Sequence, residues 1–199
     1  MSELRPGETL EDLERDGLKI IQKEKGFRFG VDAVLLSDFA RVKKKDLVMD
    51  FCTGTGILPI LLYGKSHARQ IMGIELQVEF AEMAMRSVKL NHIEDQVKIL
   101  MGDIRDEKLL KSLPRFDVVT VNPPYKKENS GIINEKDALT IARHEVTLNL
   151  EDVIRGARTV LKDQGRFYMI HRPERLADIL TLMRTYRIEP KRLRMVLSL

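Results

Sequence analysis

The sequence predicts an α/β fold, in which a mostly parallel, twisted β-sheet is covered by helices on both faces. The 199 residues match the length of one domain, and 43% of them are hydrophobic, which is enough to bury a core. Short apolar runs alternate at least five times with segments of helical periodicity. This alternation is typical of right-handed βαβ units. Ligands of such sheets bind where the strands end, so functional residues are expected directly after strands.

The N-terminal part is predicted to form a hairpin and a helix. Leu18–Gln22 and Gly26–Phe29 flank the polar turn Lys23–Lys25, which favours two antiparallel strands with a glycine at the end of the turn. Val31–Phe39 is an apolar stretch that predicts a helix, and the charge run Arg41–Lys45 ends it. Residues 1–45 are therefore expected to be an extension that precedes the sheet.

Residues 46–199 are predicted to form the main domain, in which strands and helices alternate. Pro59 falls in the first turn of its predicted helix, where proline is tolerated. The predicted strands are Leu47–Phe51, Gln70–Ile74, Val97–Met101, Phe116–Val121, Arg166–Ile170 and Arg192–Leu197. The predicted helices are Ile57–Tyr63, Val78–Leu90, Glu107–Leu113, Leu150–Leu161 and Arg175–Tyr186.

Composition excludes several classes of protein. No apolar run approaches the roughly 18 residues of a membrane-spanning helix, and Met1–Glu14 is acidic and polar, so neither membrane insertion nor a signal peptide is expected. A single cysteine and four histidines without metal-ligand spacing predict no disulfide and no metal site. A cytoplasmic protein is expected. The net charge is +4, but residues 155–199 hold 11 Lys/Arg against 4 Asp/Glu, a balance that permits contact with a polyanion such as RNA or simply forms a solvated surface.

A glycine-containing loop follows the first strand of the sheet. It runs from Asp50 to Gly56, and Gly54 and Gly56 allow the backbone to approach a ligand closely where the next helix begins. The dinucleotide-binding fingerprint is the main competing interpretation, but its third glycine would be Pro59. Asp50 would repel a pyrophosphate and could receive an ammonium group.

Two further carboxylates follow the next two strands. Glu75 is placed where a carboxylate can accept both hydroxyls of a ribose, and Asp103 where one can accept from an exocyclic amine. Each alone is ordinary helix-start or turn chemistry. The series of Asp50, Glu75 and Asp103 after successive strands is much less expected by chance.

The fourth strand ends in Asn122-Pro123-Pro124-Tyr125. The prolines constrain the backbone and lack N–H donors, which leaves carbonyl groups for a ligand. Asn122 offers a side-chain oxygen, and Tyr125 offers an aromatic face. Such a group can accept both hydrogens of a planar amino group while the ring stacks on the attached base.

These motifs resemble those of class I S-adenosylmethionine-dependent methyltransferases that methylate amino groups. The run from Gly26 to Leu36 and the segment Ala142–Glu145 make the chain similar to the bacterial tRNA1(Val) adenine-37 N6-methyltransferase group. The resemblance covers about residues 15–199 and implies a Rossmann-like fold. Such folds usually finish with an antiparallel strand, and with the chain ending at Leu199 this strand is expected to be missing.

The resemblance implies S-adenosylmethionine as cofactor, no metal, and a role for each motif. Contacts to the target base are implied for Asn122, Pro123 and Tyr125. Contacts to the cofactor are implied for Phe29, Asp32, Asp50, Thr53, Gly54, Gly56, Glu75, Asp103 and Asn122.

The function implied is methylation of N6 of an adenine in tRNA, in a protein that contacts no membrane. Three alternatives stay open: methylation of guanine N2 in rRNA, methylation of a glutamine N5 in a protein, and a non-catalytic RNA-binding module on the same fold. The oligomeric state is left open.

Overall fold

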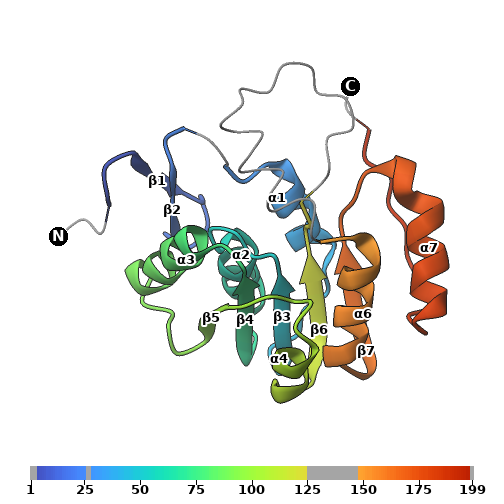
Figure 1. The fold of residues 1–199 in the computed structure, drawn as a ribbon. Helices are drawn as coiled ribbons and strands as arrows, with labels where there is room; N and C mark the ends of the chain where they lie inside the picture. Colours follow the sequence, from blue (N-terminus) through green and yellow to red (C-terminus); the bar gives the residue numbers. More distant parts are fainter. Residues whose placement is uncertain (1–3, 26–27, 125–147, 198–199) are drawn as a thin grey trace.

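The computed structural model describes residues 4–25, 28–124 and 148–197 (Figure 1). Its centre is a parallel sheet with the strand order β5-β4-β3-β6-β7. The strands of this sheet are β3 (Leu47–Phe51), β4 (Gln70–Glu75), β5 (Val97–Met101), β6 (Phe116–Val121) and β7 (Leu161–Met169). The predicted α/β fold with a mostly parallel sheet is confirmed.

Helices cover both faces of the sheet. They are α1 (Val31–Phe39), α2 (Ile57–Ser66), α3 (Val78–Leu90), α4 (Glu107–Ser112), α6 (Leu150–Val160) and α7 (Leu176–Thr185), the last preceded by the short 3₁₀-helix η1 (Pro173–Arg175). Most bounds agree with the predicted ones to within a few residues, because the apolar periodicity and the turn residues lie in the sequence itself. None of the described helices is long and apolar enough to span a bilayer.

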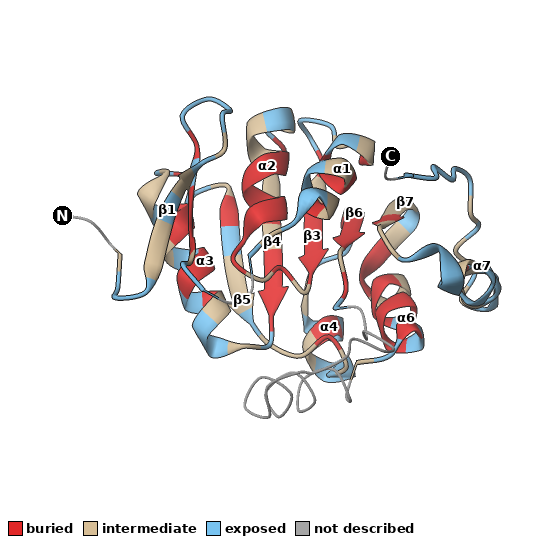
Figure 2. Cartoon of the chain, turned by 90° about the horizontal axis from the view of Figure 1, so that it is seen from above, coloured by how far each residue is buried: buried red, intermediate tan, exposed pale blue. Residues whose placement is uncertain are grey.

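The core has an apolar layer on each face of the sheet, and a small third cluster lies between α6 and α7. Val48 of β3 and Val118 of β6 belong to the layer that also contains residues of α1, α2 and α3. Their neighbours in sequence, Met49 and Val119, belong to the layer that contains residues of α4 and α6. This alternation follows from the two-residue period of a strand, and Figure 2 shows the buried residues gathered in the central strands and the helices against them.

The strand order reverses between β3 and β6. From β3 the chain proceeds through β4 to β5 on one side, whereas β6 and β7 lie on the other side. At such a switch point the loops after the two central strands diverge and leave a crevice at their carboxyl ends. Those loops begin at Cys52 and Asn122, two places that the sequence singles out.

The predicted N-terminal hairpin exists, but one of its strands was assigned wrongly. Strand β2 (Lys19–Lys23) pairs antiparallel with the upstream strand β1 (Glu8–Asp12). Arg28 and Phe29 form no strand, and Gly26 and Phe27 lie outside the described residues. The turn precedes β2: the Leu13 N–H donates to the Leu18 carbonyl at 2.9 Å, and positive φ angles at Glu14, Asp16 and Gly17 reverse the chain.

The predicted strands at the C-terminal end differ from those observed. β7 begins at Leu161 rather than Arg166, but its pairing with β6 has an irregularity and runs in register from Arg166 onward. The strand predicted over Arg192–Leu197 is wrong, because this segment pairs with no strand of the described chain. Its apolar residues are largely exposed, and Arg192 instead stacks on the ring of Phe39. Apolar residues alone do not create a strand without a neighbour to accept its hydrogen bonds.

Candidate cofactor and substrate site

The loop after β3 has an unusual backbone. Cys52, Gly54 and Gly56 have φ angles of 55°, 57° and 87°, in the left-handed region that favours glycine. Gly56 is the N-cap of α2, and a Cβ there would lie 3.1 Å from Cβ of Ala84 in α3. The glycine therefore lets the loop pass close to α3 before the helix begins.

Asp50 is fully buried at the end of β3. It lies opposite Thr120 of β6 in the parallel register, and the Thr120 hydroxyl donates to its Oδ1 at 2.6 Å. Its Oδ2 has no hydrogen-bond partner among the described residues. Burial raises the pKa of Asp50 to about 7, because the charged form loses its hydration. Sequence reasoning missed Thr120, because threonine is common in strands and its partner is decided by the register.

Glu75 holds the two loops at the ends of β3 and β4 together. Its Oε2 accepts a hydrogen bond from the Gly54 N–H at 2.8 Å, and its Oε1 accepts one from the Gln77 N–H at 2.9 Å. The residue is 6% exposed. Since a carboxylate has about four lone-pair positions, both oxygens retain capacity for ligand hydroxyls.

Asp103 lies after β5 and is paired with Arg105. The Arg105 guanidinium donates from Nε and Nη2 to this carboxylate at 2.5 to 3.0 Å, and the Arg105 backbone N–H donates to Oδ1 at 2.8 Å. These bonds hold the pKa of Asp103 below its ordinary value. Asp103 is thus kept ionised and oriented. Sequence reasoning missed Arg105, since arginine two residues after a turn aspartate is common on surfaces.

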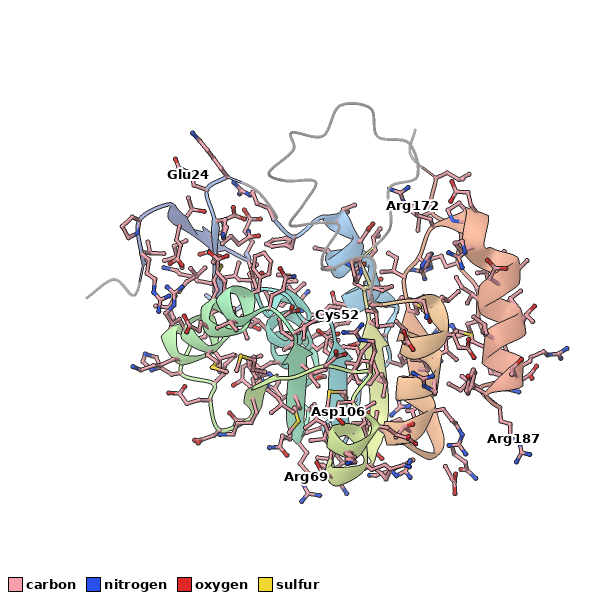
Figure 3. All side chains as sticks on the ribbon, in the orientation of Figure 1. Glu24, Cys52, Arg69, Asp106, Arg172 and Arg187 are labelled. Carbon is pink, nitrogen blue, oxygen red and sulfur yellow. The ribbon has the colours of Figure 1, made fainter. Side chains whose placement is uncertain are left out.

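The three carboxylates converge on one place. Burial first, and then the charges of Glu75, Asp50 and Asp103, raise the pKa of the Cys52 thiol. The Gly54 N–H bond to Glu75 and the neighbouring strand ends of β3, β4 and β5 place these carboxylates at one edge of the sheet. Figure 3 shows Cys52 at the carboxyl ends of the central strands.

The loop after β6 begins beside the buried Asp50–Thr120 pair. Asn122, two residues after Thr120, is half-buried, Pro123 is buried and Pro124 is exposed. Tyr125, which the sequence singles out for base stacking, lies outside the described residues. The sheet thus brings Asn122 and Pro123 to the same edge as Asp50.

Phe29 and Asp32 lie before and within α1. The Phe29 N–H donates to Oε1 of the buried Gln22 at 2.9 Å, and Gln22 donates to Oε2 of Glu11 at 2.6 Å. Asp32 is half-buried in the first turn of α1. The observed contacts therefore tie Phe29 to the N-terminal hairpin, and α1 lies at the same end of the molecule as the carboxyl ends of the strands (Figure 1).

The site has the donors and acceptors that a polar cofactor with an ammonium group requires. Asp50 Oδ2, Thr53 Oγ1 and Thr55 Oγ1 are buried and have no hydrogen-bond partner among the described residues. Buried polar atoms are normally satisfied, so three such atoms near one glycine loop fit a ligand. No group of three or more His, Cys, Asp or Glu that could hold a metal is found in the described part of the chain.

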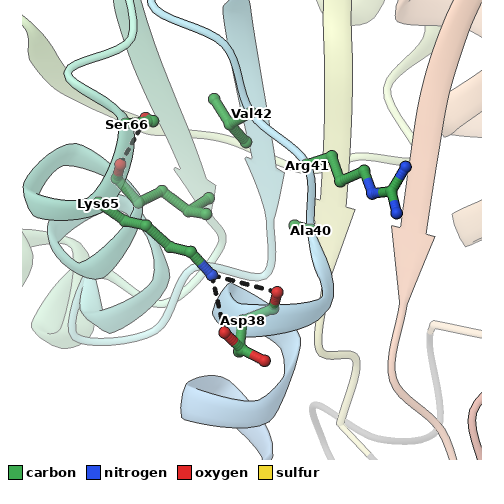
Figure 4. Close-up of a pocket in the computed structure, with 7 residues that line it drawn as sticks. Asp38, Ala40, Arg41, Val42, Lys65 and Ser66 are labelled. Atoms are coloured by element: carbon green, nitrogen blue, oxygen red, sulfur yellow. Dashed lines mark hydrogen bonds and ion pairs between the residues drawn. The ribbon is translucent and has the colours of Figure 1, made fainter.

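Two cavities elsewhere on the molecule are not this site. One of about 280 Å³ lies between the end of α1, the loop before β3 and the end of α2, with Lys65 bonded to Asp38 at its wall (Figure 4). Its lining contains none of the carboxylates that follow the strands of the sheet. The second, of about 550 Å³, lies between residues of α4, α6 and the start of β7.

Comparisons with known proteins show the family. The model of the TRM5/TYW2 methyltransferase domain matches residues 20–148. The tRNA1(Val) (adenine(37)-N6)-methyltransferase of Porphyromonas gingivalis is 34% identical over 178 residues, covering 86% of this chain and 69% of that protein. The protein of the same name from Bacteroides thetaiotaomicron is 27% identical over 144 residues, covering 72% of this chain and 59% of that protein.

A solved structure shows the same fold. That of a predicted O-methyltransferase from Agrobacterium tumefaciens is 22% identical in sequence and superposes with a TM-score of 0.58, covering 76% of this chain and 66% of that one. The resemblance predicted from the motifs is confirmed. The chain belongs to the methyltransferase family defined by the TRM5/TYW2 methyltransferase domain, and the bacterial tRNA1(Val) (adenine(37)-N6)-methyltransferases are its relatives.

Proposed function

We propose that this chain transfers a methyl group from S-adenosylmethionine to N6 of an adenine in tRNA, in the cytoplasm. The observation that carries the proposal is that Asn122 and Pro123 follow β6 directly beside the buried Asp50–Thr120 pair, at the reversal of strand order. Acceptors for a planar amino group thus adjoin a carboxylate suited to an ammonium group. The names of the relatives supply the substrate class.

The carboxylates after β3, β4 and β5 hold the cofactor in this proposal. When bound, S-adenosylmethionine supplies an electrophilic methyl group on a sulfonium. Asp50, with the loop residues Thr53, Gly54 and Gly56, receives the ammonium of the methionine part, and this ammonium offsets the cost of an ionised carboxylate in a buried place. Glu75 accepts from the ribose hydroxyls with the lone pairs that Gly54 and Gln77 leave free.

Asp103 accepts from the adenine amino group of the cofactor. Its partner Arg105 makes this more effective, since the guanidinium keeps the carboxylate ionised and in one orientation. Phe29 and Asp32 close over the methionine end.

Asn122 and Pro123 act on the target base. Their carbonyl oxygens accept the two N–H groups of the exocyclic nitrogen and draw it toward tetrahedral geometry, which exposes its lone pair. This is orientation together with stabilisation by fixed dipoles, and losing one such contact typically costs about 3 to 4 kcal/mol in the transition state. Tyr125 stacks on the base after it leaves its loop, a contact of about 1–3 kcal/mol.

The test is to offer the chain the candidate substrates side by side. Total tRNA from a strain without this gene, unmodified rRNA and a protein release factor are incubated with the chain and labelled S-adenosylmethionine. Mass analysis of the digested products is expected to find N6-methyladenosine in tRNA. N2-methylguanosine in rRNA, methylglutamine, or cofactor binding without transfer to any of the three would contradict the proposal.

A further inference from the structure

Two basic segments far apart in sequence meet on one side of the molecule. The run Arg41–Lys45 leads from α1 to β3, and the segment after α7 returns to α1 (Figures 1 and 2). The Arg192 guanidinium carbon lies 4.4 Å from the centroid of the Phe39 ring, and that of Arg194 lies 5.4 Å from it. Stacking on the last residue of α1 brings both arginines next to the run that begins at Arg41.

Strand β7 supports this junction. Arg166 of β7 donates to the Arg41 carbonyl at 2.6 Å, which holds the beginning of the basic run against the sheet. The Phe39 ring makes an edge contact with Tyr168 of β7, with 6.0 Å between the ring centroids. Tyr168 lies opposite Thr120 in the parallel register, and Thr120 precedes Asn122 by two residues. The arginines on Phe39 are therefore near the methyl-transfer edge of the sheet.

The positive charge of the run Arg41–Lys45 is not balanced by neighbouring carboxylates. Asp38 already has Lys65 at 3.0 Å and Arg194 at 3.7 Å, and Asp46 already has Arg166 at 2.6 Å. For the exposed Arg41, Lys43, Lys44 and Lys45, no carboxylate within ion-pair distance is found in the described part of the chain. Figure 4 shows the Arg41 side chain pointing away from the Asp38–Lys65 pair.

Several basic residues of α6, η1 and α7 do have neighbouring carboxylates. Arg155, Arg158, Arg175 and Arg184 each have an acidic partner close in sequence, at distances of 2.6 to 3.8 Å. These four arginines are therefore paired locally. The surface that the loop before β3 shares with the C-terminal segment instead gathers four exposed basic residues of one run without an ion-pair partner in the described part of the chain, Arg41, Lys43, Lys44 and Lys45.

We propose that a basic stripe, made of Arg41, Lys43, Lys44, Lys45, Arg192 and Arg194, binds the phosphate backbone of the RNA whose base is methylated. This inference rests on the proposed function. The stripe begins before the amino end of β3 and reaches Phe39 beside β7, so it extends over about one strand length, roughly 17 Å. That length allows contact with several successive phosphates, which position an RNA without reading its sequence.

The test compares two triple variants of equal charge. K43Q/K44Q/K45Q removes three positive charges from the stripe. R69Q/K98Q/K108Q removes three exposed positive charges near β4, β5 and α4, and is the matched control. The affinity for an unmodified tRNA transcript is measured between 50 and 200 mM salt, together with S-adenosylmethionine affinity and thermal unfolding.

The stripe variant is expected to bind tRNA at least tenfold more weakly at low salt. The slope of log affinity against log salt should be shallower by about 2, since each phosphate contact contributes about 0.7 to 0.9. R192Q/R194Q should reduce the slope by about 1.5 for the same reason. Cofactor affinity, unfolding temperature and the methylation rate at saturating tRNA should stay as in the parent chain.

Two results would overturn the stripe and leave the proposed function intact. One is an unchanged salt slope in the stripe variant while the parent chain methylates tRNA; the other is an equal loss of tRNA affinity in the control variant. A parent chain that neither binds nor methylates tRNA would instead overturn the proposed function, and the stripe with it.

Discussion

Replacing Thr120 by valine tests whether the buried Asp50 must be ionised to bind the cofactor. Valine keeps the shape of threonine and removes the hydroxyl that donates to Asp50 Oδ1 at 2.6 Å. A hydrogen bond to a charged group contributes about 1.5–3 kcal/mol, and 1.36 kcal/mol corresponds to a change of one in pKa. We therefore expect the pKa of Asp50 to rise by about 1 to 2 above its present value of about 7.

This change predicts a pH-dependent loss of cofactor affinity. At pH 7 the ionised fraction of Asp50 should fall from about one half to a tenth or less, so affinity for S-adenosylmethionine should fall by about 5-fold to 50-fold. The difference should shrink as the pH rises toward 9, where Asp50 ionises in both proteins. Deprotonation of the cofactor's own amino group affects both alike and cancels in the ratio of the two affinities.

Isothermal titration calorimetry between pH 6 and 9 measures this ratio. Thr120→Ser is the control, since serine keeps the hydroxyl, and it should retain most of the affinity. A ratio between Thr120→Val and the parent chain that stays the same at every pH would refute the reasoning. So would a serine variant as weak as the valine variant, because the loss would then come from packing.

Two further predictions concern the carboxylates at the carboxyl edge. The pKa of Asp50 is about 7 in the folded chain, against an ordinary value of 3.8, so the folded chain holds an extra proton between these pH values. Its free energy of unfolding should therefore fall as the pH rises from 4 to 7. Asp50→Asn should remove this decrease in urea titrations, and an identical pH dependence in both proteins would contradict the prediction. Glu75→Ala should weaken S-adenosylmethionine binding tenfold or more. It should also lower the free energy of unfolding by about 1–3 kcal/mol, because the Gly54 and Gln77 N–H groups lose their acceptor. Unchanged affinity in calorimetry would remove Glu75 from the cofactor site.

The sheet could be predicted closely from the sequence because its signals are local. β3 and β6 are short apolar runs that are followed by glycine or proline, and the structure gives them the predicted bounds. β1 could not be predicted, because Glu8–Asp12 is mainly acidic and has no strand pattern. Its Glu8 forms an ion pair with Arg86 of α3, which lies 78 residues away in sequence. A contact of that kind is decided by tertiary packing and not by local preference.

The candidate site divides in the same way. Asp50, Glu75 and Asp103 could be found because each follows a strand, and in a parallel sheet all such positions share one edge. Thr120 and Arg105 could not be found in this way. The role of Thr120 depends on its lying opposite Asp50 in the strand register, and that of Arg105 on its side chain turning back onto Asp103. The sequence therefore predicts which residues share the site but not which neighbours set their charge.

The central claim is that Asn122 acts on the target amino group while Asp50 holds the cofactor. Asn122→Ala separates the two roles, with S-adenosylmethionine affinity measured by calorimetry and methyl transfer by single turnover on an unmodified tRNA transcript. The account predicts nearly unchanged cofactor affinity and a methylation rate lower by roughly two orders of magnitude or more, the usual effect of losing one preorganised polar contact. Methylation at the parental rate would contradict the account, and an equal loss of affinity and rate would place Asn122 in the cofactor pocket instead.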